Sequence, residues 1–375
     1  MGALVRPASL VRLILAAAFL VMLGANLPGH LSYDSVAQLH EGHFGVRETW
    51  QPVLYARLLG AFDAVVPGTG LYVVAASLLL FLCLASLAAL RDRTSWLAVP
   101  VTIAALVTPQ LFIYQAIVWK DVMFANAAVA GMVCLANAAR AWATPSRWAW
   151  LAGAALMLAV AGLVRQNGLI VTVFAAIALG WIAGQGGWRR GLAWAAAGFV
   201  VVLALAQVLN ATAQLPSKGP QAGLGQGLRI VQQYDLVAAT ALDRSYGLPT
   251  LTRANPTAAA VIRERAYDYY SPERIDFIDR DVAIQAALNA LPDAAVREEW
   301  LGLVLKHPGL YLRIRADDFR WVFLTPVVDR CLSNYVGVAA PDKMLRDLGQ
   351  QPRWTDADQQ LANYWTWFLD TPAYS

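Results

Sequence analysis

The sequence predicts an all-α membrane protein, in which a multi-span helical bundle of about seven spans over residues 1–208 precedes a mostly helical soluble domain over residues 209–375. Three observations predict this class. The chain of 375 residues is 58% hydrophobic and only 14% charged, whereas soluble proteins carry about 25% charged residues. Apolar runs of about 17–22 residues recur before residue 208, a length that crosses a hydrocarbon core about 30 Å thick. Arginines gather in alternate loops between these runs.

The apolar runs define the predicted spans. The first run follows two arginines, but it is long for a signal peptide and no convincing cleavage motif follows it, so we expect an uncleaved span. The seven spans are residues 10–29, 70–90, 96–114, 122–139, 147–164, 168–184 and 191–208.

The basic residues of the loops predict the orientation. Loops rich in Lys and Arg stay in the cytoplasm, so we expect a cytoplasmic N-terminus in a bacterial inner membrane. The outer side then receives the loop of residues 30–69, two short loops (115–121 and 165–167) and the domain after residue 208. The arginines on the predicted cytoplasmic side are Arg6, Arg12, Arg91, Arg93, Arg140, Arg147, Arg189 and Arg190.

The formal net charge of +4 does not indicate a nucleic-acid partner. Residues 1–208 hold 12 Lys and Arg against 6 Asp and Glu, and the remaining residues hold 17 against 19. The basic excess therefore lies in the short loops of the bundle, where it orients the spans, rather than in the clustered patch that nucleic acid requires.

Two stretches of the first outer loop have the periodicity of helices with one apolar face. These are Ser35–His40 and Val53–Val66, and their aromatic residues suit a helix lying along the headgroup layer. Past residue 208, the Gly-rich stretch 219–227 lacks the GK[ST] ending of a phosphate loop, so we interpret it as a linker.

Ionisable and amide residues stand where the outer ends of the spans are expected. Asp34 follows the first span, Lys120 and Asp121 open the fourth, and Arg165 and Asn167 occupy the turn between the fifth and the sixth. Charged groups near the hydrocarbon edge are costly unless paired or hydrated, so they indicate a functional site. Two cations at one face, beside a helix N-terminus, suit a phosphate or pyrophosphate.

Each residue also has a structural interpretation. Lys120 and Asp121 would pair as an interfacial anchor, and Arg165 would reach phospholipid headgroups. Asp34 would cap the helix that begins near Ser35. The two interpretations of Asp34 are compatible with each other.

No metal site is predicted. The loop histidines His30, His40 and His43 are interpreted as surface or interfacial residues, because the pair at 40 and 43 lacks a third ligand. One firm carboxylate leaves a divalent cation, Mg²⁺ or Mn²⁺, optional.

Several segments resemble motifs of the GT-C superfamily of integral-membrane glycosyltransferases, and more narrowly those of a bacterial branch of it. They are SYDS (32–35), ETWQPVLY (48–55), WKDVMFA (119–125) and RQNGL (165–169), with QQYDL (232–236), YSPERID (270–276) and HPGLY (307–311) extending the likeness beyond the bundle. The order of span, long outer loop with an early acid, bundle and outer domain is similar too.

The resemblance implies a transferase that moves a sugar from a polyprenyl-phosphate donor to a hydroxyl of a glycan or protein acceptor, with inversion. It implies that Asp34 takes the place of an acidic residue that acts as base or metal ligand, and that Lys120 and Arg165 bind the donor phosphate. Asp121 would orient Lys120, and Asn167 would bind sugar hydroxyls or cap the sixth span.

Aromatic residues would complete this site. Tyr33, Trp50 and Trp119 would contact the sugar or the prenyl chain, although interfacial belts use the same residue types. The chain departs from the superfamily pattern at residues 50–53, where WQPV replaces a WHPP-type motif, and at its C-terminus, where further spans are usual. A shortened or impaired enzyme is therefore expected.

Two other function classes stay open. A transporter or flippase for a lipid-linked anion would need charges inside the bundle and broken helices. A non-enzymatic envelope assembly protein would use the domain after residue 208 as its working part.

Overall fold

The computed structural model describes residues 6–90, 94–165, 167–218, 224–273, 281–324 and 334–371. Over these residues the chain is helical, with a few isolated backbone bridges and no strand. The chain clusters into two compact units. Unit 1 comprises residues 1–48, 52–218 and 334–375, and unit 2 comprises residues 49–51 and 219–333.

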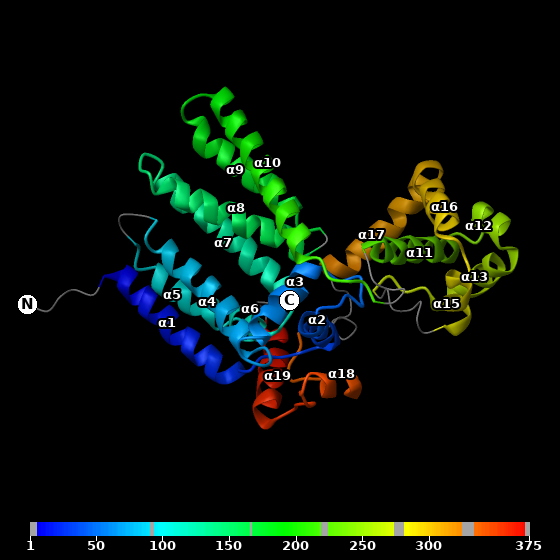
Figure 1. Ribbon diagram of the computed structural model, residues 1–375, viewed down its shortest axis with the longest axis horizontal. Helices are drawn as coiled ribbons and strands as arrows, with labels where there is room; N and C mark the ends of the chain where they lie inside the picture. Colours follow the sequence, from blue (N-terminus) through cyan, green and yellow to red (C-terminus); the bar gives the residue numbers. More distant parts are fainter. Residues whose placement is uncertain are drawn as a thin grey trace, which may run out of the picture. The chain divides into compact units, whose positions relative to one another are not determined.

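Unit 1 contains the apolar helices and the short helices at one end of their bundle (Figure 1). Its elements are α1 (Pro7–Asn26), α2 (Tyr33–Phe44), α3 (Val53–Asp63), α4 (Gly70–Leu87), α5 (Ala98–Leu106), α6 (Pro109–Phe112), η1 (Tyr114–Ala116), α7 (Lys120–Arg140), α8 (Arg147–Val164), α9 (Ile170–Gly184), α10 (Trp188–Ala213), α18 (Asp342–Asp347) and α19 (Asp356–Leu369).

Five described helices, α1, α4, α7, α8 and α10, are long and apolar enough to cross a membrane. The bent pair of α5 with α6–η1 raises the number to six if it is counted as one span, and α9 is apolar but only 15 residues long. The predicted all-α class is therefore confirmed for the described residues, and the helices are compatible with a membrane protein. Five or six of the seven predicted spans meet these criteria.

A proline breaks the third predicted span. The axis of α5 meets that of the following helical residues, Pro109–Ala116, at 73°. A residue before proline is disfavoured in the helical conformation, and Thr108 is accordingly extended, with φ −78° and ψ 142°. Proline is well tolerated in the first turn of a helix, so Pro109 ends one helix and opens the next.

The two ends of the bundle differ in charge. The turns α7–α8 and α9–α10 lie at the same end as the start of α1, whereas α2 and α3 lie at the opposite end (Figure 1). Six of the eight arginines predicted to be cytoplasmic are among the described residues, and all six stand at the end where α1 starts. They are Arg6, Arg12, Arg140, Arg147, Arg189 and Arg190. The side of a membrane that each end faces stays a prediction.

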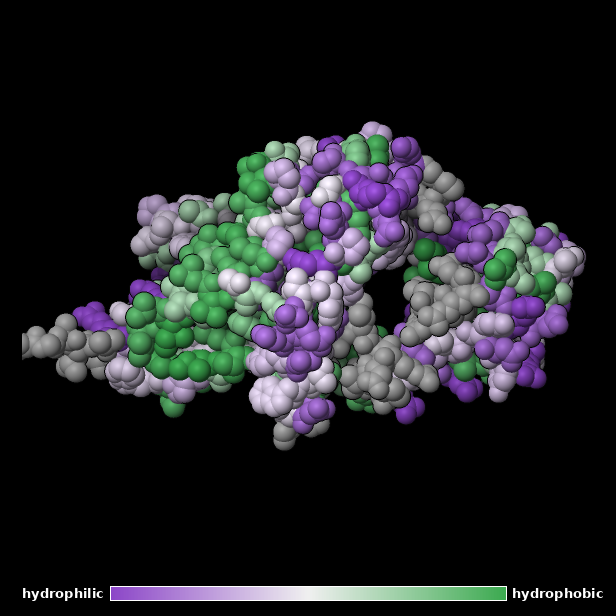
Figure 2. All heavy atoms as spheres, turned by 90° about the horizontal axis from the view of Figure 1, so that it is seen from below, coloured by the Kyte–Doolittle hydropathy of each residue, from purple (hydrophilic) through white to green (hydrophobic). Residues whose placement is uncertain are grey.

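The bundle presents an apolar surface. On the face drawn in Figure 2, hydrophobic residues cover the helices and hydrophilic residues gather beyond their ends. Leu20 of α1, Trp181 of α9 and Val200 of α10 are 67%, 78% and 62% exposed. Apolar patches of this extent mark a partner or membrane surface, and the lengths of the helices favour a membrane.

The predicted helices of the first outer loop are confirmed as α2 and α3. They cross where Gly42 meets Gly60, and a Cβ atom added to Gly60 would lie 2.3 Å from the carbonyl oxygen of Gly42. At the end of α2, Gly45 adopts the left-handed conformation (φ 66°) that glycine reaches at no steric cost. The close crossing fixes the direction in which α2 runs.

Because the Gly42–Gly60 crossing leaves no space, we expect Gly60→Ala to destabilise unit 1 by about 1–3 kcal/mol or more. The matched control is Gly24→Ala in α1, where nothing lies within 4 Å of an added Cβ and alanine favours a helix. Thermal unfolding of the purified protein in detergent would check this. Equal midpoints for the two variants would contradict the crossing.

Unit 2 is a second helical cluster with its own core. Its helices are α11 (Leu224–Leu242), α12 (Pro249–Ala254), α13 (Pro256–Tyr269), α15 (Val282–Asn289), α16 (Asp293–Lys306) and α17 (Pro308–Leu324). In the QQYDL segment the fully buried Asp235 pairs with Arg315 and accepts a 2.7 Å hydrogen bond from Trp300 Nε1. This motif therefore joins α11 to α16 and α17. Residues 274–276 of YSPERID lie outside the described residues.

The two units divide the chain differently from the predicted boundary at residues 208 and 209. The predicted second domain included everything to residue 375, but residues 334–375 cluster with unit 1. The cause is physical: Leu31 exchanges backbone hydrogen bonds with Gly337 and Ala339, at 2.9 and 3.1 Å. A contact across 300 residues of chain is not visible in hydrophobic periodicity.

Candidate functional site

A short backbone pairing brings two helix N-termini together in unit 1. His30 donates its N–H to the Ala116 oxygen at 2.9 Å, and Val118 donates to the His30 oxygen at 3.0 Å. The two segments run parallel, with His30 opposite Ile117. Helix α2 begins three residues after His30 and α7 begins three residues after Ile117. The first turns of α2 and α7 therefore start side by side.

Trp119 links the same two segments through its side chain. The indole Nε1–H donates a 2.9 Å hydrogen bond to Ser32 Oγ, which lies 3.2 Å from Ser35 Oγ. The indole ring also meets the Tyr114 ring edge-on, with the centroids 6.2 Å apart. Trp119 thus joins the residue before α7 to the residue before α2. Its expected contact with a sugar or prenyl chain stays a prediction.

Four charged side chains gather at this junction. Lys120, in the first turn of α7, interacts electrostatically with Asp34, Asp121 and Arg165. Arg165 Nη1 lies 2.5 Å from Asp121 Oδ1, and its guanidinium lies over the Phe124 ring, 5.9 Å from the centroid. Segments that are far apart in the chain thus bring together the Asp34 carboxylate, the Lys120 ammonium group and the Arg165–Asp121 ion pair.

The exposure of these groups suits a binding site. Asp34 is exposed, and the Asp121 and Arg165 side chains are 42% and 41% exposed, whereas Lys120 is half-buried. Asp121, expected to orient Lys120, interacts with it electrostatically but makes its short ion pair with Arg165. The guanidinium has five N–H donors, so an anion would share Arg165 with Asp121.

The remaining predicted residues do not all join this cluster. Tyr33 is 54% exposed in the first turn of α2, beside Asp34. Asn167 is exposed, and Leu169 rather than Asn167 precedes α9 as its N-cap residue, so the predicted capping by Asn167 is wrong. Trp50 belongs to unit 2, where its ring lies against Gly227.

Comparison of the chain with models of known protein families, with curated proteins and with solved structures found no match. A carboxylate, an ammonium group and a guanidinium beside two helix N-termini can bind an anion and accept a proton in the same place.

Two of the loop histidines make polar contacts with carboxylates, and His43 is exposed, as expected for a surface residue. His43 Nδ1 lies 2.5 Å from Asp63 Oδ2, and half-buried His40 lies 3.4 Å from Glu48 and 3.6 Å from Asp347. Over the part of the chain that the structure describes, no group of three or more His, Cys, Asp or Glu side chains is placed to hold a metal ion.

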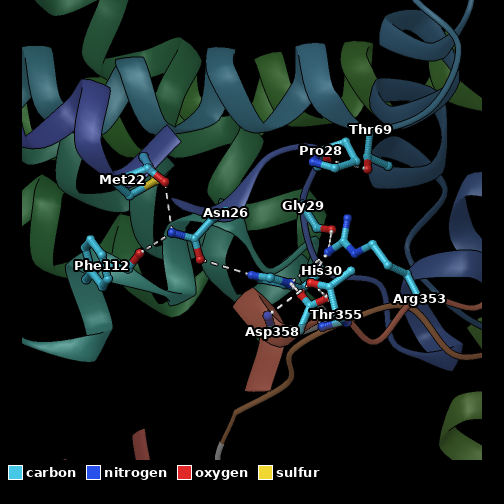
Figure 3. Close-up of polar contacts among 11 residues, drawn as sticks. Met22, Asn26, Pro28, Gly29, His30, Thr69, Phe112, Arg353, Thr355 and Asp358 are labelled. Carbon is cyan, nitrogen blue, oxygen red and sulfur yellow. Dashed lines mark hydrogen bonds and ion pairs between the residues drawn. The ribbon is translucent and has the colours of Figure 1, made fainter. Parts of the chain in front are cut away.

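His30 is the residue that sequence reasoning missed most clearly. Its side chain is 1% exposed, and it belongs to a polar network with Asn26, Arg353 and Asp358 (Figure 3). The prediction of a surface histidine was therefore wrong for this residue. Helical spacing does not explain the contact with Asn26, because α1 ends at Asn26 and residues 27–32 are not helical. Nothing in the local sequence pointed to Arg353.

Proposed function

We propose that the chain is a membrane glycosyltransferase that moves a sugar from a polyprenyl-phosphate donor to an extracytoplasmic acceptor hydroxyl, on a glycan or a protein. The single observation that supports this is the electrostatic cluster of Lys120 with Asp34, Asp121 and Arg165 at the junction of α2 and α7. The proposed location is a bacterial inner membrane, with the N-terminus in the cytoplasm and the junction at the outer face.

In the proposed reaction, the acidic and the basic side chains of the cluster have different roles. The acceptor oxygen attacks the anomeric carbon and forms the new glycosidic bond, while Asp34 takes the hydroxyl proton. The bond from the anomeric carbon to the phosphate oxygen breaks, and its electron pair leaves with polyprenyl phosphate. Lys120 and Arg165 stabilise that leaving anion, and attack from the opposite face inverts the anomeric centre.

The positions of these groups support the division of roles. Lys120 begins the apolar helix α7, and Arg165 follows the apolar helix α8. Both residues would therefore stand at the level of the phosphate of a lipid-linked sugar. Asp34 stands on α2, outside the candidate spans, where an acceptor from the aqueous phase would arrive. A donor anchored in the bilayer and a soluble acceptor would meet there.

One observation keeps a second candidate open. Transporters of charged solutes often contain discontinuous helices, and the 73° bend between α5 and α6–η1 is of that kind. A flippase for a lipid-linked anion would use the same cations without cleaving its substrate. Near the bend two buried amide side chains meet: Asn126 donates to Gln115 Oε1 at 2.9 Å and to the Ala76 oxygen at 3.1 Å.

The experiment uses the purified full chain in sealed proteoliposomes with a radiolabelled polyprenyl-phosphate sugar and a mixed glycan and peptide acceptor pool. We expect label to leave the lipid fraction and one polyprenyl phosphate to appear for each sugar transferred. A nucleotide sugar, offered as the control donor, should give no product. Intact labelled donor crossing the bilayer without release of polyprenyl phosphate would refute the transferase and support the flippase.

A further inference from the structure

The segment that carries Asp34 is held on two sides by other parts of unit 1. His30 pairs with residues 116–118 on one side. On the other side Leu31 donates to the Gly337 oxygen and accepts from Ala339 N–H, and Val338 in turn exchanges hydrogen bonds of 2.9 and 3.0 Å with Arg353. The start of α2 therefore lies between the α6–α7 connection and the C-terminal segment of residues 334–371.

Side chains reinforce the second of these pairings (Figure 3). Arg353 Nη2 donates to the Gly29 oxygen at 2.8 Å and to His30 Nδ1 at 3.1 Å, and it lies 3.3 Å from Asp358 Oδ1. Asp358, at the start of α19, also accepts from the N–H and the hydroxyl of Thr355, both at 2.8 Å. One arginine thus joins α19 to the backbone just before α2.

The hydrogen bonds fix the protonation state of His30. Nδ1 accepts from Gly337 N–H at 3.1 Å and from Arg353, so it carries no proton. Nε2 then carries the proton and donates to Asn26 Oδ1 at 3.0 Å. Burial, together with the Arg353 charge and against the opposing Asp358 charge, lowers the pKa of His30 to about 4. At neutral pH the ring is therefore neutral and in a single tautomer.

We propose that the C-terminal segment 334–371 is a clamp that positions Asp34, with His30, Arg353 and Asp358 as its positioning residues. This inference rests on the proposed transferase function. None of the three residues belongs to the charged cluster itself. They act through the backbone of residues 29–32, whose direction sets where the first turn of α2 points.

The clamp makes a specific kinetic prediction. The C-terminal segment also packs against the residues before α7, where the Trp365 ring lies 5.6 Å from the Tyr114 ring between centroids. These apolar contacts do not use the Asp358 carboxylate, so donor binding by Lys120 and Arg165 should survive its loss. We expect Asp358→Asn to lower kcat at least about tenfold, because a displacement of about 1 Å at a reacting group has effects of this order or larger. The KM for the donor should stay within about twofold. The matched control is Asp356→Asn, an exposed carboxylate in the first turn of the same helix.

A disulfide can replace the clamp. Leu31 and Val338 stand opposite each other in a parallel bridge, at the spacing of neighbouring strands, which lies within the range that a disulfide spans. In a chain with its three native cysteines changed to alanine, Leu31→Cys with Val338→Cys should restore the kcat of Asp358→Asn when oxidised and lose it on reduction. An oxidised, locked Asp358→Asn protein that stays slow overturns the clamp.

A measurement without any donor separates this inference from the transferase proposal. We expect Asp358→Asn, but not Asp356→Asn, to speed deuterium uptake of the peptide covering residues 29–44 and to lower the yield of the 31–338 disulfide. Unchanged uptake and yield overturn the clamp even if transfer is found. Absence of transfer by the wild-type chain refutes the proposed function while these two readouts still judge the clamp.

Discussion

Asp34→Asn is expected to reduce sugar transfer by about 10²–10⁴-fold, the usual effect of removing a general base. The amide keeps the size of the carboxylate, and the change removes no cap, because the residue before α2 is Ser32 and the predicted capping by Asp34 is wrong. The amide cannot take the proton of the acceptor hydroxyl. The exposed position of Asp34 in the first turn of α2 leaves folding little affected, so the change should appear in kcat at an unchanged protein level in the membrane.

The matched control for Asp34→Asn is Asp342→Asn. Asp342 is likewise an exposed carboxylate in the first turn of a helix of unit 1, but it belongs to α18 and not to the charged cluster. Its loss should leave turnover unchanged. The rate of product formation at saturating donor and acceptor is the measurement. Near-normal turnover by a folded Asp34→Asn protein would remove the base from the mechanism.

Lys120→Ala is expected to have the second-largest effect, a loss of about 10²–10³ in turnover. A well-placed donor to a developing anion contributes roughly 3 kcal/mol to the transition state, and Lys120 is the half-buried cation of the cluster. Arg165 and Asp121 pair directly with each other, so their contact should persist in the variant. The residual activity would then come from Arg165 and from the helix N-termini.

Two comparisons define the role of Lys120. Lys343→Ala removes an exposed lysine near the start of α18 and should change nothing. Lys120→Arg keeps the charge but not the shape, so it should recover part of the loss. Single-turnover measurements with bound donor would separate binding from chemistry. If Lys120→Ala raised the donor KM and left the single-turnover rate unchanged, Lys120 would bind the ground state and would not stabilise the leaving phosphate.

The fold was predictable where local rules decide it. Runs of apolar residues predicted α1, α4, α7, α8 and α10, and one-sided periodicity predicted α2 and α3. The break at Pro109 was also readable in principle, because proline disfavours helix in the residue before it. The apolar content of residues 96–114 hid it, since composition is summed over a window and is insensitive to a bend inside that window.

The site was predictable only in part. Counting alternate loops placed Asp34, Lys120 and Arg165 at one end of the bundle, and their electrostatic interactions agree with that grouping. The ion pair of Asp121 with Arg165 depends on how α7 and α8 pack, which spacing along the chain does not contain. Two partners of His30, Arg353 and Asp358, lie more than 300 residues away, so only tertiary structure could reveal them.

The parallel pairing of His30 with Ile117 makes the lengths of two connections part of the chemistry. An α-helix turns by about 100° per residue. One residue inserted between Ile117 and Lys120 would rotate the first turn of α7 by that angle and direct the ammonium group away from α2, although the apolar composition of the helix would not change. A chimera that exchanges either connection should therefore preserve residue count before it preserves residue type.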